Sequence, residues 1–412
     1  MPSVAIAVLL TVTSAAAQAV LDDPVKIAHA EQRLDTFQGE RLNCAVTSMK
    51  PRFNFSLRLQ AGYVYRVPLN QYRGAGHAWI VLTRITPQEG NQLPVYLADV
   101  DPLPPVPNTD MEAEVAGTWW VGEGRYRVKS LLFDDSGRGC LKEWRIEARL
   151  SAAGRKVKPR IAPHTVVGLT WRGSPPSEHA NSGALSRLTI LLDAAAMFPM
   201  RTLLTASDRT LLLDALSALV EELPARSVKL VVFHLGLQKE VFRRDGFTTD
   251  AMPEVVQAIA ELQPSLVDYS VLQNQGGALE LIANLANLEI RAPAPSDAVI
   301  FLGPRARYTG KIPAGALDQP SGRAPRFFYL QCVPRPNGRG PGPGLTTGAP
   351  LARLGMGGVL GVDSIIPPMP NGFSDSIGDA VARLKGKIMF AGSPEEFAQA
   401  IAEVERSVGT RK

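Results

Sequence analysis

Ten residues near the middle of the chain decide the fold of its C-terminal half: Leu188-Thr189-Ile190-Leu191-Leu192-Asp193-Ala194-Ala195-Ala196-Met197. The first five are apolar except for Thr189, and the run then stops at the carboxylate of Asp193. A short, almost continuous apolar run is typical of a strand that is buried on both faces of a parallel sheet. The stretch therefore predicts a central strand that ends at Asp193.

Similar apolar runs follow, separated by segments with helical spacing. The runs expected to form strands are Val228–Phe233, Ala298–Leu302, Phe327–Val333 and Lys387–Phe390. Apolar residues three or four positions apart predict the intervening helices. A closing helix begins at Ser393-Pro394-Glu395-Glu396, which is a capping box with Pro at the first helical position. This alternation predicts an α/β domain over residues 187–408, with a doubly wound parallel sheet of the Rossmann type.

The N-terminal half carries strand signals of another kind. Phe53, Phe55, Leu57 and Leu59 alternate with polar residues, and similar short runs recur between Gly and Pro clusters. This pattern predicts an antiparallel, immunoglobulin-like β-sandwich over residues 41–150. The remaining segments are a leader at 20–40, a linker at 151–186 and, inside the α/β domain, a Gly/Pro-rich insertion at 334–372.

The first residues resemble an export signal. Residues 1–19 contain no charged side chain, Val4–Val12 is apolar except for Thr11, and small residues follow from Ser14 to Ala19. This layout predicts a signal peptide over 1–19, although the Lys or Arg usual at its start is missing. No other segment has about 18 consecutive apolar residues, so no stable membrane span is expected in the mature chain. We therefore expect an exported protein of bacterial type, periplasmic or secreted.

The chain has three cysteines, at positions 44, 140 and 332. Export favours disulfides. Cys44 and Cys140 bracket the β-rich half, and we expect them to form a disulfide. Cys332 lies in an apolar strand-like run and is expected to be a buried free thiol.

Composition bounds the function classes. Of the 412 residues, 45% are hydrophobic and 20% are charged, which is typical of a globular protein. The net charge of +5 is spread along the chain, without the interleaved aromatic and basic residues of nucleic-acid binders. Nucleic acid is therefore not an expected partner. The densest basic cluster, between Arg155 and Arg160, is expected to be a solvated part of the linker, and an anionic surface partner is the alternative.

Residues 187–408 resemble a von Willebrand factor type A domain in the order of their predicted elements. An apolar strand ending in Asp193 is followed by a long helix, a strand at Val228–Phe233 and a helix that begins at Gly276-Gly277-Ala278-Leu279. The strand at Ala298–Leu302 and the closing Ser-Pro-Glu-Glu-Phe helix complete the likeness. The resemblance covers about half of the chain and is one of pattern and spacing.

That resemblance implies a divalent-cation site at the top of the sheet, and the sequence lacks most of its ligands. The family's positions fall on Asp193, Ala195, Met197, Ala278 and Pro304, and only Asp193 offers a side-chain oxygen. One carboxylate does not displace the hydration shell of Mg²⁺, which wants an octahedral set of hard oxygen ligands. We therefore expect a degenerate site, with no metal and no cofactor.

A binding face without a metal is the function that the resemblance implies. Phe198, Leu235, Arg305 and Tyr308 are expected on that face, together with the insertion. Apolar and Arg side chains on a rim are typical of a protein interface, although the same residues also suit packing beneath the insertion. The prediction is a non-enzymatic exported protein that binds an unidentified protein partner, in adhesion or in envelope or extracellular assembly.

Two alternatives from other classes stay open. Exposed, coplanar indoles at Trp119 or Trp120 and at Trp144 would support a carbohydrate-binding sandwich, with the α/β half as scaffold, and burial of all three would exclude it. A hydrolase would need a Ser or Asp partner beside His234, which ends an apolar strand. The sequence contains no Gly-x-Ser-x-Gly, no His-Glu-x-x-His and no P-loop, so no catalytic residue is assigned.

Overall fold

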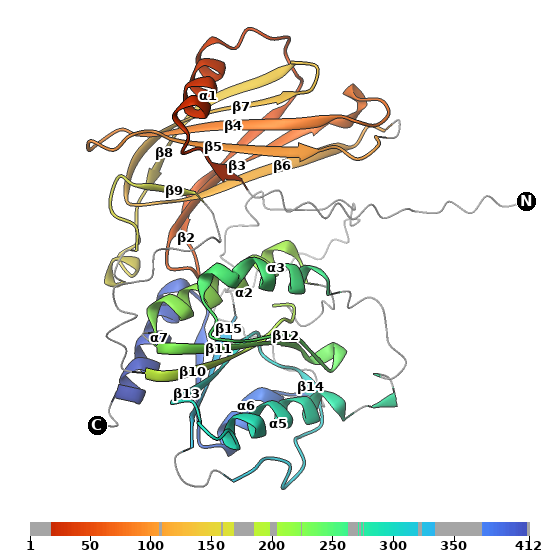
Figure 1. Ribbon diagram of the computed structural model, residues 1–412, viewed down its shortest axis with the longest axis vertical. Coiled ribbons are helices and arrows are strands. Elements are labelled where there is room, and N and C mark those ends of the chain that lie inside the picture. The colour runs from red at the N-terminus through yellow and green to blue at the C-terminus, as the bar shows by residue number, and fades with distance from the viewer. Residues whose placement is uncertain are drawn as a thin grey trace, which may run out of the picture. The chain divides into compact units, whose positions relative to one another are not determined.

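A computed structural model gives the chain as two compact units (Figure 1). Unit 1 comprises Met1–Arg52, Arg58–Ser151 and Pro159–Thr170; unit 2 comprises Phe53–Leu57, Ala152–Lys158 and Trp171–Lys412. The structure describes residues 18–106, 109–157, 160–168, 185–197, 204–223, 225–262, 271, 273–274, 276–319, 324–333 and 373–409. Most of the predicted signal peptide, Phe198 and the insertion at 334–372 lie outside these residues.

Unit 1 contains two antiparallel sheets. The five-stranded sheet has the order β1 (Ala19–Val20), β5 (Val95–Pro102), β4 (Ala78–Pro87), β7 (Gly124–Asp134) and β8 (Gly139–Ala148). The four-stranded sheet has the order β2 (Ala45–Phe53), β3 (Leu59–Pro68), β6 (Glu112–Val121) and β9 (Val166–Gly168). The residue pairs between β3 and β6 run from Leu59 opposite Val121 to Pro68 opposite Glu112, a long register in keeping with the alternating sequence.

Large aromatic side chains form much of the core of unit 1. Tyr63, Tyr65, Trp119 and Tyr126 are fully buried. The ring of Tyr63 lies 5.2 Å from that of Tyr65 and 6.0 Å from that of Trp119, centroid to centroid. Such aromatic pairs add to the stabilisation that comes from burial of their surface.

The predicted leader segment contains a helix, α1 (Pro24–Thr36), that packs on unit 1. Asp23 caps it, because its side chain accepts a hydrogen bond from the Val25 N–H at 2.8 Å. The helix buries Ala30 and Leu34 in a small cluster with Tyr96 and Leu131. Its amphipathic face therefore belongs to the fold.

The predicted disulfide is present. Cys44, just before β2, is bonded to Cys140 in β8, and the two residues are 96 positions apart in the sequence. Their Cα atoms are 6.3 Å apart, within the usual range for a disulfide. The bond closes a loop that contains most of the strands of unit 1.

Unit 2 is built on a six-stranded sheet. Its order is β12 (Lys239–Asp245), β11 (Ala225–His234), β10 (Leu185–Asp193), β13 (Ala298–Gly303), β15 (Arg326–Cys332) and β17 (Lys387–Ala391). Strands β11, β10, β13, β15 and β17 are parallel, and β12 pairs antiparallel with β11. A separate ladder of two residues per strand joins β14 (Tyr308–Thr309) to β16 (Phe373–Ser374).

The predicted fold class was wrong. The sheet of unit 2 is mixed, whereas the sequence predicted a doubly wound parallel sheet, and strand residues outnumber helical residues among those described. The cause is the short connection after β11, the single turn η4 (Leu235–Leu237) followed by Gln238 in the left-handed conformation. So short a connection can only return the chain antiparallel to the strand before it.

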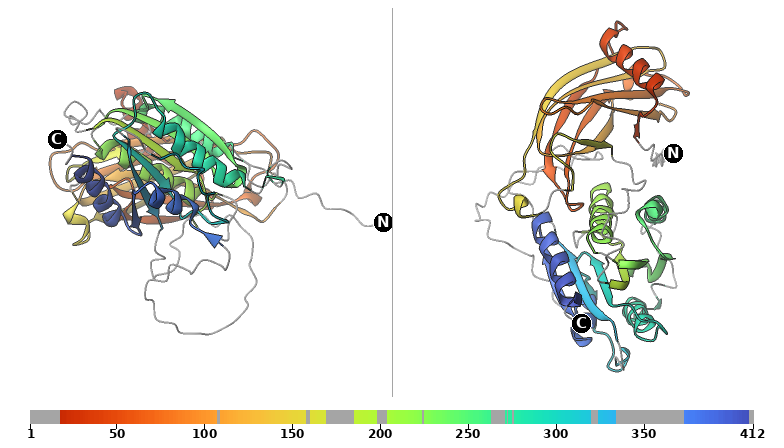
Figure 2. Two further views of the ribbon diagram at one scale, coloured as in Figure 1. Left: turned by 90° about the horizontal axis from the view of Figure 1, so that it is seen from below. Right: turned by 60° about the vertical axis from the view of Figure 1, so that its left-hand side comes forward.

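Apolar side chains cover both faces of the sheet in unit 2. Leu188, Ile190 and Leu192 belong to one buried cluster, and Leu191 belongs to the other, as expected when successive side chains of a strand point to opposite faces. The first cluster includes α2 (Ala206–Glu222), α3 (Met252–Ala260) and α7 (Pro394–Gly409); the second includes α5 (Gly277–Ile290) and α6 (Ser376–Arg383). Helix α7, dark blue in Figure 2, lies along β15 and β17.

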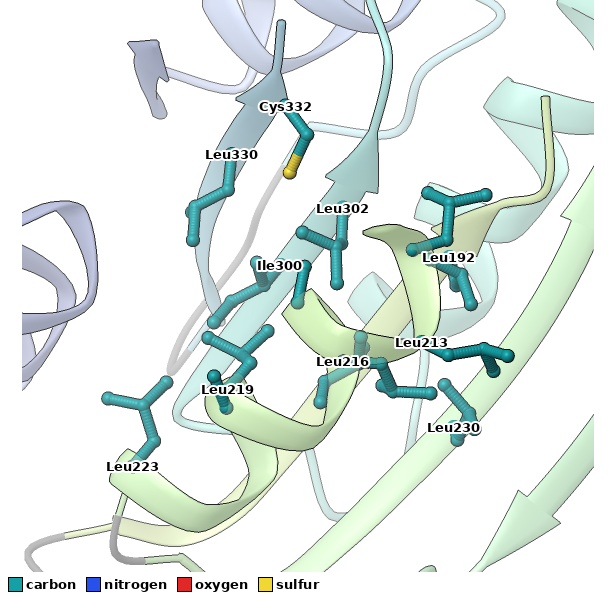
Figure 3. Packing of buried hydrophobic residues seen from close by; sticks show 14 of the residues in the cluster. Leu192, Leu213, Leu216, Leu219, Leu223, Leu230, Ile300, Leu302, Leu330 and Cys332 are labelled. Carbon is teal, nitrogen blue, oxygen red and sulfur yellow. The ribbon is translucent and has the colours of Figure 1, made fainter. Parts of the chain in front are cut away.

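Figure 3 shows the first cluster at the contact between α2 and the strands. Leu216 and Leu219 project from the helix on the side of Ile300 of β13, and Leu213 lies on the side of Leu192 and Leu230. Cys332 lies in the same cluster, fully buried, and burial raises the pKa of its thiol to about 12. It is the free, buried thiol that the sequence predicted.

Candidate functional site

The carboxyl ends of the parallel strands in unit 2 meet at one edge of the sheet, where ligands bind in many α/β proteins. Strand β10 ends at Asp193, β11 at His234 and β13 at Gly303. Asp193 is paired with Phe233, and Leu192 with Leu302, so Asp193 lies between the ends of its two neighbouring strands. We take this edge as the candidate site.

Asp193 is a buried carboxyl group with few polar partners. Its residue is 1% exposed, and the backbone N–H of Leu235 hydrogen-bonds its side chain. Its Oδ1 has no hydrogen-bond partner among the described residues. Burial raises the pKa of Asp193 to about 8, so the group is protonated and neutral at pH 7.

The next two positions of the implied cation site are Ala195 and Met197, which lie between the end of β10 and the start of α2. Ala195 is half-buried and Met197 is buried. The Met197 N–H donates to Oδ1 of Asp208 at 3.3 Å. Asp208 also forms a capping box with Thr205, so this carboxylate is committed to the helix end.

The last two positions of the implied cation site, Ala278 and Pro304, lie in different parts of unit 2. Pro304 follows Gly303 directly and is therefore next to Asp193 at the strand ends. Ala278 lies in the first turn of α5, fully buried in the apolar cluster that contains Leu235. The structure thus brings Asp193 and Pro304 together, and it uses Ala278 as core.

These side chains do not fit a divalent cation. Ala195, Met197, Ala278 and Pro304 carry no side-chain oxygen, and the one carboxyl group is buried and protonated. Mg²⁺ and Ca²⁺ need several oxygen ligands. Among the described residues no cluster of three or more His, Cys, Asp or Glu side chains could hold a metal ion.

The loop after β13, residues 305–308, is hydrogen-bonded to residues of other elements. Tyr329 Oη donates to the Pro304 carbonyl and accepts from the Ala306 N–H at 3.1 Å. At the far end of the loop, Tyr308 pairs with Ser374 in the ladder between β14 and β16. Ser374 Oγ donates to the Gly310 carbonyl at 2.5 Å, and the Tyr308 carbonyl lies 3.3 Å from the same oxygen. The loop is therefore fixed at both ends, and we call it the 305–308 loop.

Its side chains alternate between exposure and burial. Arg305, Arg307 and Tyr308 are partly exposed, and Ala306 is buried. Burial lowers the pKa of Arg307, and the positive charge of Arg305 lowers it further. Leu235, which the sequence placed on the same face, is instead buried at 2% exposure.

A second, partly buried carboxyl group supports this loop, and sequence reasoning missed it. Asp375 caps α6 by accepting from the Gly378 N–H at 2.9 Å, and it lies 3.6 Å from Nε of Arg305. Gln331 Nε2 donates to the same carboxyl group, whose pKa is raised by burial. The available signal was an Asp directly before the helical spacing of Ile377 and Val381, which marks a cap.

The histidine at this edge is not arranged for catalysis. His234 Nδ1 accepts a hydrogen bond from the Leu237 N–H at 3.0 Å, which leaves the ring as the cap of η4. Burial lowers the pKa of His234 to about 4, so the imidazole is neutral at pH 7. Within the part of the chain that is described, no hydrogen bond joins it to a Ser, Cys or carboxyl side chain.

The indoles of unit 1 do not form an exposed pair. Trp119 is 0% and Trp120 is 3% exposed, and Arg58 stacks over the ring of Trp120 at 4.2 Å from its centroid. Trp144 is partly exposed, and its ring packs edge-on against buried Tyr63 at 6.3 Å. Trp119 and Trp120 are thus both in the core, and neither can join Trp144 in an exposed carbohydrate platform.

Comparisons with known proteins add little. No family model matches the chain, and no curated protein matches it. Among solved structures, the Northeast Structural Genomics Consortium target SoR45 matches with a TM-score of 0.17 and 16% identity, over 26% of this chain and 91% of that one. The periplasmic chaperone SfaE matches with a TM-score of 0.14 and 11% identity, over 36% of this chain and 66% of that one. At these scores neither match assigns a fold or a function.

The described part of the chain contains no helix that is both long and apolar enough to cross a membrane. The disulfide between Cys44 and Cys140 is compatible with an exported protein.

Proposed function

We propose that this chain is an exported, non-enzymatic binding protein that recognises another protein through the 305–308 loop of unit 2. The setting we propose is adhesion or assembly in the bacterial envelope or outside the cell. The relation of the C-terminal half to the von Willebrand factor type A family is part of this proposal. It rests on the order of elements along the sequence and on Asp193 at the end of β10.

The 305–308 loop is the observation that carries the proposal. Arg and Tyr are the side chains most enriched at the centres of protein interfaces. Here Arg305, Arg307 and Tyr308 are partly exposed, while Tyr329 and Ser374 hold the loop backbone in place. A pre-organised loop loses little conformational entropy when it binds, which favours affinity.

The chemistry of the site favours direct side-chain contact over contact through a cation. Asp193 is buried and neutral at pH 7, so it does not offer the partner a charge. Arg305 already lies 3.6 Å from the Asp375 carboxyl group, so Arg307 is the guanidinium group that we propose contacts an acidic group on the partner, to which it would donate several hydrogen bonds. The proposed contact is therefore Arg to carboxylate, bordered by the Tyr308 ring.

Site-specific cross-linking tests this function. A photo-reactive amino acid is placed at Arg307 in the full chain, in cells of the producing organism, and cross-linked products are separated by mass. A matched control carries the same group at Glu405, an exposed residue of α7 in the same unit. We expect a discrete protein adduct from position 307 that is absent from position 405.

A second variant separates binding from chance proximity. Arg305→Ala with the reactive group at 307 should lose most of the adduct, while the circular dichroism spectrum stays unchanged. The same adducts at 307 and 405, or no adduct at 307, would overturn the proposal.

A further inference from the structure

The outer edge of the sheet in unit 2 is open at β17. This strand is last in the order, paired with β15 on one side, and no described strand pairs with its other side. An edge strand of this kind presents unpaired backbone N–H and C=O groups, which proteins usually protect with charges, Pro or a covering element. The edge of β17 is therefore available for pairing with another strand.

Two exposed apolar side chains lie on this strand. Ile388 is 36% and Phe390 is 54% exposed. They are two residues apart and so point to the same face, while Met389 and Ala391 point the other way into the cluster around α7. An exposed aromatic ring beside an open strand edge gives an incoming strand both backbone partners and an apolar contact.

A basic pocket begins where β17 begins. It has a volume of about 520 Å³ and its lining includes Arg326, Arg383, Lys385 and Lys387. None of the described residues that line it is an Asp or a Glu. It lies at the amino ends of β15 and β17, the edge of the sheet opposite the 305–308 loop.

Two of the four cations are available to a ligand. Lys387 is paired with Glu403 at 2.7 Å, and Arg383 is paired with Asp379 at 3.0 Å. For Arg326 and Lys385, no ion pair is present among the described residues. The pocket therefore has a net positive charge that the described part of the protein does not neutralise.

The backbone at Lys385 supports a role beyond solubility. Lys385 follows the end of α6 with φ of 55°, a left-handed conformation in which Gly is the usual residue at a helix end. A Lys there costs conformational energy that Gly would not. The next residue is Gly386, where a Cβ would lie 2.5 Å from the Phe327 carbonyl oxygen, so the turn is tightly packed. The chain thus places a cation in a strained position at the mouth of the pocket.

We propose that the edge of β17 and this basic pocket form one docking surface for an extended acidic segment of another protein. The segment adds to the sheet as a strand beside β17, covers Ile388 and Phe390 with apolar side chains, and places a carboxylate in the pocket between Arg326 and Lys385. Charge complementarity selects the partner: the pocket is cationic and none of the described residues that line it is acidic. This surface is distinct from the 305–308 loop and does not depend on it.

Selection from random peptides displayed on phage, with the full chain as bait, tests the proposal. The expected peptides combine alternating apolar residues with Asp or Glu at one end. A synthetic copy of the leading peptide, labelled with fluorescein, is then titrated with the chain in an anisotropy measurement. Its affinity should fall as salt rises, because exposed charges are screened.

Three variants locate the binding. Phe390→Glu should abolish it, because the acidic side chain would lie beside the acidic peptide. Lys385→Gly should weaken it about tenfold or more, the usual effect of losing a hydrogen bond to a charged group. Because Gly suits the left-handed conformation, Lys385→Gly keeps the turn intact and separates charge from folding. Leu93→Glu, at an 81% exposed apolar residue of unit 1, is the matched control and should bind like the unsubstituted chain.

Other occupants of this docking surface would give different results in these binding measurements. Selected peptides without acidic residues, or peptides that bind Lys385→Gly and Phe390→Glu as well as the original, would overturn the proposal. A concentration-dependent dimer in analytical ultracentrifugation that Phe390→Glu dissociates would identify a second copy as the occupant and would also overturn it. A monomer that binds acidic peptides, and loses them in both variants, would support it.

Discussion

Gly303 lies against Asp193 with no room for a side chain between them. A Cβ at Gly303 would be 2.9 Å from the backbone oxygen of Asp193 and 3.0 Å from its Cβ. The φ angle of Gly303 is 154°, a value that residues with a Cβ rarely adopt. The two strand ends can therefore stay in contact without strain only if residue 303 is Gly.

Replacement of Gly303 by Ala should destabilise unit 2 by about 1–3 kcal/mol, through backbone strain together with overpacking. The measurement is urea denaturation followed by far-ultraviolet circular dichroism. Helices α2, α3, α5, α6 and α7 all lie in unit 2 and dominate that signal. Gly315→Ala is the control: its φ is 82°, but no atom lies within 4 Å of the added Cβ. Equal losses in the two variants would show that the contact with Asp193 has no effect.

Asp193 should make the stability of unit 2 fall as the pH rises. Its pKa is about 8 in the folded state and near 3.8 in its ordinary state, so between these values the folded chain binds one more proton than the unfolded chain. The free energy of unfolding then decreases by about 1.4 kcal/mol per pH unit from this group. Asp193→Asn cannot titrate and should remove that slope.

The test compares unfolding curves of the original chain and Asp193→Asn between about pH 5 and pH 9. The difference in free energy between them should grow in favour of the variant as the pH rises, and level off above about pH 8. Asp245→Asn, at an exposed Asp of β12, is the control and should run parallel to the original chain. Parallel curves for Asp193→Asn would contradict the prediction.

The strands that the sequence predicted well are those in which almost every residue is apolar, which indicates burial on both faces. Leu188–Leu192 and Ala298–Leu302 are apolar on both faces and form β10 and β13 at the centre of the sheet. Strand β12, Lys239–Asp245, is mostly charged and mostly exposed because it lies at the sheet edge. No periodicity marks such a strand, and the error in fold class followed from missing it and its antiparallel direction.

The candidate site, too, could be predicted only in part from the sequence. Asp193 could be found because it ends an apolar run, and the absence of metal ligands could be read from residue types alone. The support of the 305–308 loop could not, because Tyr329 and Asp375 are 46 residues apart in the numbering and meet that loop only in the folded chain. Burial of Leu235 likewise depends on α5, which covers η4.

Removal of the disulfide should destabilise unit 1 strongly. The bond closes a loop of 96 residues, and the chain-entropy model gives about 4–5 kcal/mol for loops of that length. A chain with both Cys44→Ser and Cys140→Ser should unfold at lower denaturant concentration. Intrinsic fluorescence follows this transition, because Trp79, Trp119, Trp120 and Trp144 lie in unit 1.

Reduction provides the control for that pair. A reducing agent should shift the fluorescence transition of the original chain to that of the double variant and should leave the variant unchanged. If the original chain unfolds at the same point with and without reductant, the bond does not stabilise unit 1.

Tyr329→Phe should release the 305–308 loop. The Tyr329 hydroxyl is the hydrogen-bond partner of both Pro304 O and Ala306 N, and its loss leaves two buried backbone groups unpaired. The expected cost is about 1–3 kcal/mol in the stability of unit 2. Hydrogen exchange of the Ala306 amide should also become faster, which a general loss of packing elsewhere would not single out.

Divalent cations should leave the melting temperature of the chain unchanged. A ligand that binds only the folded state adds about 2.7 kcal/mol of stability at a hundredfold excess over its dissociation constant, so even a modest site is visible. Thermal unfolding of the full chain is measured with Mg²⁺, Mn²⁺ or Ca²⁺ and again with EDTA, and the same scans are run on Asp193→Ala. A shift that appears in the original chain and disappears in Asp193→Ala would mean that backbone carbonyls complete a cation site around this carboxyl group. If the arginines of the 305–308 loop contact the partner directly, no cation is needed, and the thermal unfolding curves of each protein should coincide with and without ions. Asp193, which is buried and protonated, is then part of the packing beneath the loop.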